Sequence, residues 1–190
     1  MSNLDEAVFR AINQAGSNVA LDDIMVLFTI LGMSFVIVFI CVPVWLKGRR
    51  ELAVDIVAAV VLASLIAELI KLLVDRQRPF EILVDANTII SASGPSFPSA
   101  HASRAFAVAT LFLFSSSRRT GIVAFAIAAL IAVSRVYLGV HWPSDVIAGA
   151  LVGIAMGYAV HVLGKNVTPY ARVRSYLLSL PQNVISKPRT

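Results

Sequence analysis

The sequence predicts an all-α fold: an integral membrane helical bundle with five to six transmembrane or interfacial helices. Of its 190 residues, 58% are hydrophobic and 14% are charged, whereas about a quarter are charged in an ordinary soluble domain. The mean hydropathy of +0.82 reflects long apolar runs. A helix needs about 20 apolar residues to cross a hydrocarbon layer roughly 30 Å thick. The composition therefore excludes a disordered chain and disfavours a water-soluble domain.

Five apolar stretches are the candidate spans: about 24–46, 52–74, 102–115, 121–138 and 146–163. The third is short, and it reaches full length only if its helix starts near Pro98. An apolar face at helical spacing precedes the spans: Leu4, Val8, Ala11, Ile12 and Ala15. This pattern predicts that residues 1–20 form an N-terminal helix lying in the membrane interface.

Basic residues are distributed unevenly between the two ends of the spans. Ten of the sixteen Lys and Arg residues lie after 46, around 116–119 or beyond 164, all at one end of an alternating bundle. The positive-inside rule places this end in the cytoplasm. We therefore expect a membrane-embedded domain over 1–165 and a basic cytoplasmic tail over 166–190. The net charge of +5 then reflects membrane orientation, and no nucleic-acid partner is predicted.

Most of the remaining basic residues crowd at the opposite, outer end of the spans, against the bias that sets the topology. Cations gathered beside a membrane away from the cytoplasm indicate an anionic ligand. The segments that carry them are KLLVDRQRP at 71–79, GPSFPSAHASRAF at 94–106 and SRVYLGVHWPSDV at 134–146.

The middle segment has the features of a phosphate-binding helix start. Pro98 suits a first helical turn, in which the amides of Ala100 and His101 are free donors. Ser99 adds a hydroxyl, and His101 can carry a proton near neutral pH. The structural alternative is that Ser99 only caps the helix and His101 is an ordinary interfacial histidine.

The flanking segments supply cations and a possible nucleophile. Lys71 and Arg78 are two helical turns apart and point the same way. Arg135 is a planar bidentate donor, and Asp145 follows His141 at an offset that suits an acid orienting a nucleophilic ring. Alternatively, Lys71 and Arg78 are flanking charges and Asp145 is a helix-start residue. For these alternatives to hold together, three separate loop ends on one membrane face would each have to carry such residues by chance.

These ordered motifs resemble the type 2 phosphatidic acid phosphatase (PAP2) family, whose signatures are KxxxxxxRP, PSGH and SRxxxxxHxxxD. They occur here at 71–79, 98–101 and 134–145, a stretch of about 75 residues. One departure is Ala100, which replaces a glycine but keeps the backbone amide. A second concerns the spans: relatives usually have six, so the N-terminal helix would be a shortened sixth.

The resemblance implies a metal-independent phosphatase that uses no cofactor and works through a phosphohistidine. His141 would attack phosphorus, Asp145 would hold its ring, and His101 would protonate the leaving oxygen. The implied phosphate ligands are Lys71, Arg78, Ser99, Ala100 and Arg135. The single cysteine, Cys41, excludes an internal disulfide, and no Cys/His cluster has the spacing of a metal site.

A site at headgroup depth favours a lipid phosphate or diphosphate as substrate, with membrane lipids around it. Polyprenyl diphosphate, phosphatidylglycerol phosphate and phosphatidic acid are all candidates. The alternatives are a small transporter or channel for a phosphate-like anion, and a structural assembly subunit.

Several further residues carry weaker expectations. Arg104 either reaches the phosphate or anchors a span end, and Asp75 is the expected helical partner of Lys71. Asp55 and Glu68 are expected to face the bundle, with partners unnamed. Glycines recur every four residues along the last span: Gly149, Gly153 and Gly157. They predict a close-packing seam, either within the bundle or in a homodimer.

Overall fold

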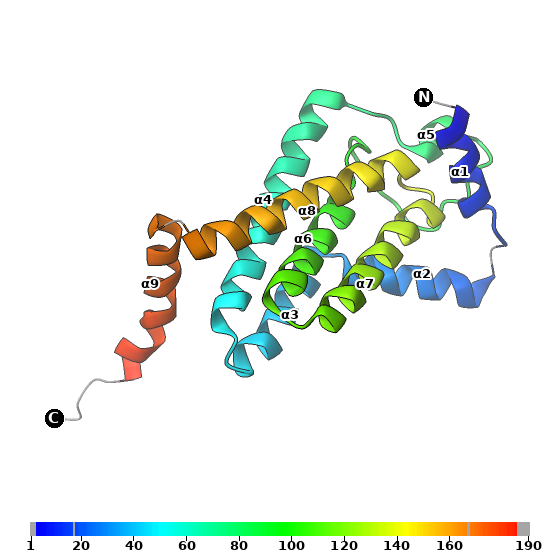
Figure 1. Cartoon of the computed structure of the whole chain (residues 1–190). Coiled ribbons are helices and arrows are strands. Elements are labelled where there is room, and N and C mark those ends of the chain that lie inside the picture. The colour runs from blue at the N-terminus through cyan, green and yellow to red at the C-terminus, as the bar shows by residue number, and fades with distance from the viewer. Residues whose placement is uncertain (1–2, 17, 167, 186–190) are drawn as a thin grey trace.

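A computed structural model of the chain describes residues 3–16, 18–166 and 168–185. The regular structure in these ranges is helical, which confirms the predicted all-α bundle (Figure 1). The helices are α1 (Asn3–Asn13), α2 (Val19–Leu31), α3 (Ser34–Leu46), α4 (Arg50–Val74), α5 (Pro79–Ile82), α6 (Ala100–Ser115), α7 (Arg118–Tyr137), α8 (Pro143–Asn166) and α9 (Thr168–Ile185).

The apolar segments account for three or four candidate membrane spans in the described part of the chain. Those that pass by length and composition are Arg50–Ile82, Arg118–Tyr137 and Pro143–Asn166. The span expected over 24–46 is instead the pair α2 and α3, whose axes are bent by 68°. The third expected span is α6, which is apolar but has only 16 residues.

Helix α6 lies at the centre of the bundle and packs against α4, α7 and α8. The glycine seam of α8 makes the α6–α8 contact possible. A Cβ atom at Gly149 would lie 2.5 Å from the carbonyl oxygen of Ser99, and α6 carbonyls approach Gly153 and Gly157 even more closely. The seam is therefore buried within the bundle, and this surface is not exposed for a homodimer.

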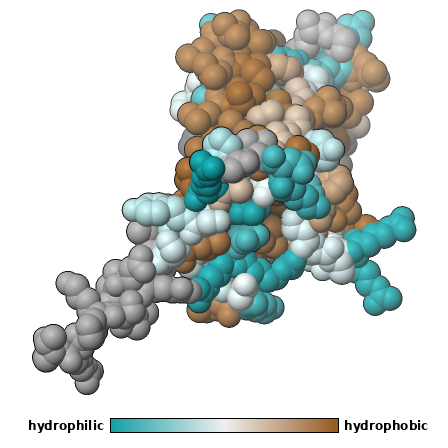
Figure 2. All heavy atoms as spheres, turned by 60° about the vertical axis from the view of Figure 1, so that its left-hand side comes forward, coloured by the Kyte–Doolittle hydropathy of each residue, from teal (hydrophilic) through white to brown (hydrophobic). Residues whose placement is uncertain are grey.

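The end of the bundle predicted to be cytoplasmic is held together by arginines. Arg49 donates a hydrogen bond to Ser116 Oγ at 2.7 Å, which joins the loop before α4 to the loop after α6. Asp55 faces inward as predicted, and its partners come from α9: Tyr170 Oη at 2.7 Å and Arg174 Nη1 at 3.0 Å. The helix over residues 168–185 was not predicted from the sequence, which indicated only a basic tail there. Figure 2 shows hydrophilic side chains gathered around the end from which α9 leaves.

Helix α1 is amphipathic as predicted and lies across the opposite end of the bundle (Figure 1). Its apolar residues Leu4 and Val8 are exposed, whereas Asp5, Phe9 and Asn13 are buried against the protein. The Phe9 ring lies 5.2 Å from the Trp142 ring between centroids. An 11-residue helix is about 16 Å long, which is too short to cross a bilayer.

Candidate active site

The three sequence motifs meet at the end of the bundle that α1 covers. Arg78, which follows α4, donates a hydrogen bond to the carbonyl of Val140 at 2.7 Å. The backbone N–H of Ser99, just before α6, donates to the carbonyl of Asp145 at 2.9 Å. Segments more than 40 residues apart are thereby tied directly to one another.

Unpartnered polar atoms mark the centre of this region. Within the described residues, the buried side-chain atoms without a hydrogen-bond partner are Ser99 Oγ, His101 Nε2, Arg135 Nε and His141 Nδ1. All belong to residues that the sequence analysis assigned to the site. Leaving such an atom unsatisfied costs about 1–3 kcal/mol, so their concentration indicates a place built for a polar ligand.

His141 lies in the loop between α7 and α8, and its Nδ1 atom is 3.4 Å from Oδ2 of Asp145. This contact is longer than a hydrogen bond, but it directs the Nδ1 side of the ring toward the carboxylate. Burial lowers the pKa of His141 to about 4, although the Asp145 carboxylate acts in the opposite direction. The ring is therefore neutral at pH 7. With its hydrogen on Nδ1, it has a lone pair on Nε2.

His101 is held by Arg104 from the same helix. Arg104 Nη2 lies 3.3 Å from His101 Nδ1, and Arg104 Nε donates to the carbonyl of Gly32 at 3.3 Å. Because a guanidinium only donates, Nδ1 must accept and the ring hydrogen must be on Nε2. This contact fixes the tautomer of His101. The two roles considered above for Arg104, phosphate ligand or span anchor, stay predictions.

Gly32, at the bend between α2 and α3, gives the His101 ring its space. A Cβ atom at this position would lie 2.9 Å from His101 Cδ2 and 2.8 Å from Ile131 Cγ2. Gly32 was not predicted as a site residue, because a glycine inside an apolar run has many structural explanations.

The two site arginines have different surroundings. Arg135 is buried, and its Nη1 donates to Thr29 Oγ1 at 2.6 Å while Nε has no partner. Arg78 instead donates to the carbonyls of Val140 and residues 93–95, at 2.7 to 3.3 Å. Arg135 thus has a donor available for phosphate. Arg78 mainly fastens two loops beside the site and contributes its charge.

Lys71 contacts Glu68 rather than the expected partner, Asp75. The Lys71 Nζ to Glu68 Oε1 distance is 2.9 Å, and the Glu68 side chain is 62% exposed, so the prediction that Glu68 faces the bundle was wrong. Asp75 ends α4 in a left-handed conformation with φ of 40°, which turns it off the helical face. The charge of Lys71 still lies close enough to act on His101.

Ser99 does not serve merely as a helix cap. It occupies the N-cap position of α6, but its side chain makes no capping hydrogen bond. The hydroxyl and the first-turn amides, which start at Ala100, are therefore all placed at a helix N-terminus, where anions bind well.

Arg76 is the functional candidate that the sequence analysis missed. Its Nη1 donates to Asp145 Oδ1 at 2.7 Å, and its Nη2 donates to Asp5 Oδ2 of α1 at 2.6 Å. Its guanidinium carbon lies 5.3 Å from the centre of the Trp142 ring. Asp5 also accepts a hydrogen bond from the N–H of Ser144 at 2.9 Å. The only sequence signal was the excess of cations over 71–79.

The described residues contain no group of three or more His, Cys, Asp or Glu side chains that could hold a metal ion. Metal independence itself remains a prediction, because it concerns the reaction.

Comparisons with known proteins agree with the motifs. The family model described as the PAP2 superfamily matches residues 52–169. The putative undecaprenyl-diphosphatase YbjG of Escherichia coli is 31% identical over 157 residues, covering 81% of this chain and 79% of the relative.

Two solved structures share the fold. Aquifex aeolicus LpxE has a TM-score of 0.79 and 30% identity, with 84% of this chain and 96% of that one covered. A PAP2-type phosphatidylglycerolphosphate phosphatase from Bacillus subtilis has a TM-score of 0.70 and 24% identity, with 88% and 89% covered. The chain belongs to the PAP2 superfamily and is a multi-pass integral membrane phosphatase of that type.

Proposed function

We propose that this phosphatase hydrolyses a polyprenyl diphosphate or a similar lipid phosphate at the extracytoplasmic membrane face, through a phosphohistidine on His141 and without a metal. The observation that carries the proposal is that three unpartnered polar atoms from the family motifs, Ser99 Oγ, His101 Nε2 and Arg135 Nε, lie at the end of the bundle where the His141 ring faces Asp145. Family membership favours this enzyme over the transporter or assembly subunit considered above.

The first step is attack of His141 Nε2 on phosphorus. The N–P bond forms while the bond from phosphorus to the leaving oxygen breaks. Positive charge develops on the imidazole, and Asp145, 3.4 Å from Nδ1, stabilises it. Attack by water on the phosphohistidine then releases phosphate and restores the free ring.

His101 handles the leaving oxygen. In the tautomer set by Arg104, Nε2–H donates a hydrogen bond to that oxygen. Full proton transfer needs the imidazolium, in which Nδ1 also carries hydrogen and the contact to Arg104 lengthens. The neutral ring that remains accepts a proton from the attacking water in the second step.

Positive charge and amide donors account for the rest of the catalysis. Arg135 Nε, Ser99 Oγ and the first-turn amides of α6 are placed to hold phosphoryl oxygens, where the transition-state charge is spread. Arg76 positions Asp145 and, through it, the nucleophile.

An apolar groove supports a lipid rather than a soluble ester as substrate. It has a volume of about 350 Å³ and is lined by residues from α2, α3, α6 and α7, including Leu31, Ala105, Ala124 and Ile131. Ala105 is one helical turn beyond His101, and Ile131 lies against the bend that surrounds the His101 ring. A hydrocarbon chain bound in this groove would have one end close to His101. Burial of each of its methylene groups contributes about 0.8 kcal/mol to binding.

A substrate panel tests this proposal. Polyprenyl diphosphate, phosphatidylglycerol phosphate, phosphatidic acid and a water-soluble phosphomonoester are compared by released phosphate in detergent. We expect kcat/KM for the preferred lipid to exceed that of the soluble ester by about 100-fold or more, since several buried methylenes contribute to binding. Equal turnover of lipid and soluble substrates would contradict the lipid assignment.

The same substrate panel, applied to a variant of the groove, tests where the hydrocarbon chain of the lipid binds. Ala124→Phe fills the groove, so we expect about a tenfold loss of kcat/KM on the long-chain lipid, with the soluble ester unaffected. Ala126→Phe adds the same ring to an exposed position of α7 and is the matched control. If both variants lose lipid activity equally, the groove is not the chain-binding site.

A further inference from the structure

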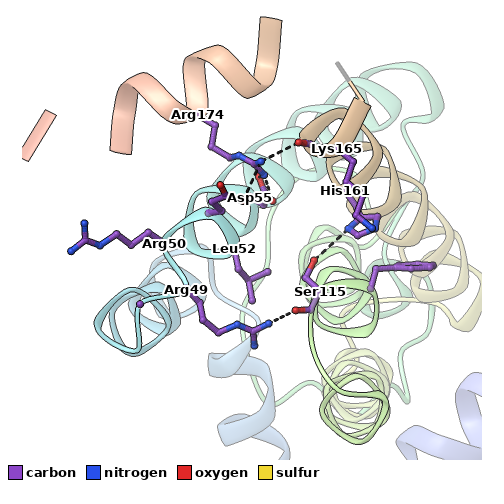
Figure 3. Close-up of a pocket in the computed structure, with 12 residues that line it drawn as sticks. Arg49, Arg50, Leu52, Asp55, Ser115, His161, Lys165 and Arg174 are labelled. Carbon is purple, nitrogen blue, oxygen red and sulfur yellow. Dashed lines mark hydrogen bonds and ion pairs between the residues drawn. The ribbon is translucent and has the colours of Figure 1, made fainter. Parts of the chain in front are cut away.

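A second polar cavity lies at the other end of the bundle, where α4 begins and α6 and α8 end. It has a volume of about 410 Å³, and Figure 3 shows side chains from these helices and from α9 around it. Twenty residues of α8 separate Asp145 from Lys165, about 30 Å at 1.5 Å per residue. This cavity is therefore distinct from the catalytic site.

The cavity carries excess positive charge. Four basic residues and two carboxylates line it, which leaves a net charge of +2: Arg49, Arg50, Lys165 and Arg174 against Glu51 and Asp55. Arg174 contacts both carboxylates, at 3.3 Å to Glu51 and 3.0 Å to Asp55. Both carboxylates are thus engaged by one cation, and the other three have no carboxylate partner within the described ranges.

The unneutralised cations come from two sides of the cavity. Arg49 is held by the C-terminal end of α6, through Ser115 and Ser116. Arg50 lies over the Trp45 ring, with 5.5 Å between its guanidinium carbon and the ring centre, and Figure 3 shows its side chain directed away from the cavity. Lys165, in the last turn of α8, is exposed. Arg49 and Lys165 are therefore the two unneutralised cations that can approach one oxyanion in the cavity.

The surroundings indicate a lipid headgroup as the source of that anion. The cavity opens at the ends of spanning helices, where headgroups lie, and Phe114 in its lining is 48% exposed. Leu52 and Phe114 form apolar parts of its lining. A free phosphate would use the cations alone, whereas a phospholipid would use both the cations and the exposed apolar surface.

We propose that this cavity binds the phosphate group of an anionic phospholipid in the leaflet at this end of the protein. The lipid phosphate completes the charge balance between the ends of α4 and α8. Because Arg174 of α9 closes one side, occupancy also favours the docked position of that helix.

The test is a titration of the full chain in dodecyl maltoside with phosphatidylglycerol, phosphatidylcholine or inorganic phosphate. The melting temperature of the protein is measured at each ligand concentration. Phosphatidylglycerol is expected to raise the melting temperature saturably, and phosphatidylcholine is expected to leave it unchanged. In the double variant Arg49→Gln/Lys165→Gln, the apparent Kd for phosphatidylglycerol should rise about tenfold or more, given the attraction of each basic residue to an anionic surface. Circular dichroism without lipid checks that the variant is folded.

The matched control is Arg118→Gln/Arg119→Gln, which removes two charges at the same end but outside the cavity lining. This control should retain the wild-type Kd, and an equal loss would show only diffuse surface attraction and overturn the proposal. A saturable shift with inorganic phosphate that the cavity variant loses supports the anion site but assigns it to free phosphate. An unchanged Kd in the cavity variant also overturns the proposal.

Discussion

The variant His141→Ala is expected to lose phosphate release by at least about 10⁴-fold, as is typical when a nucleophile is removed. No other described group is placed to replace it. The Asp145 oxygens accept hydrogen bonds from Arg76 and from the N–H of Trp142, and His101 has its Nδ1 atom engaged by Arg104. The other site residues are cations and hydroxyl or amide donors. The measurement is released phosphate from the preferred lipid under single-turnover conditions.

The His141→Ala variant should remain folded, because the imidazole has no hydrogen-bond partner on Nδ1 and its loss leaves no polar group newly stranded. An unchanged elution profile and the wild-type melting temperature within a few degrees serve as the control. Wild-type activity should persist in EDTA. Rapid turnover by the folded alanine variant would rule out His141 as the nucleophile.

The second large effect is expected at Arg76. Arg76→Gln should lower kcat by about 10- to 100-fold, the range seen when a partner that orients a catalytic ligand is lost. The Arg76 guanidinium donates hydrogen bonds to Asp145 Oδ1 at 2.7 Å and to Asp5 Oδ2 at 2.6 Å. Neither carboxylate is among the groups assigned to phosphate binding. KM should therefore change little. Arg76→Lys, which keeps the charge, should recover part of kcat.

The link from Arg76 to α1 predicts a graded series. Asp5→Asn weakens one anchor of Arg76 but leaves its contact to Asp145, so its loss of kcat should be smaller than that of Arg76→Gln. Arg10→Gln is the matched control, because Arg10 also forms ion pairs at this end but contacts Glu6 and Asp85. If Arg76→Gln behaves like Arg10→Gln, the positioning role is wrong.

The sequence predicted the parts of the site that local spacing determines. Alternation of spans brings the C-terminal ends of α4 and α7 and the N-terminal ends of α6 and α8 to one face. The meeting of Ser99, His101, Arg135 and His141 therefore followed from motif order and topology. The helices themselves followed from apolar runs whose length is set by the bilayer.

Features that depend on the path of a loop or on tertiary contacts were not predicted. The donors of Arg78 are engaged by carbonyls of residues 93–95, and nothing in the periodicity of the chain fixes where that loop runs. The bend at Gly32 falls inside a continuous apolar stretch. The partners of Asp55 lie more than 100 residues away in a segment whose composition indicated only a basic tail.

Covalent trapping tests the central claim most directly. Wild-type enzyme and the variant His101→Gln, which should slow both formation and hydrolysis of the intermediate, are mixed with substrate labelled at the terminal phosphate, quenched in alkali and mapped by mass spectrometry. The expected result is a phosphate on His141, stable to alkali and lost in acid, which appears and disappears more slowly in His101→Gln. Label on a different side chain would contradict the account.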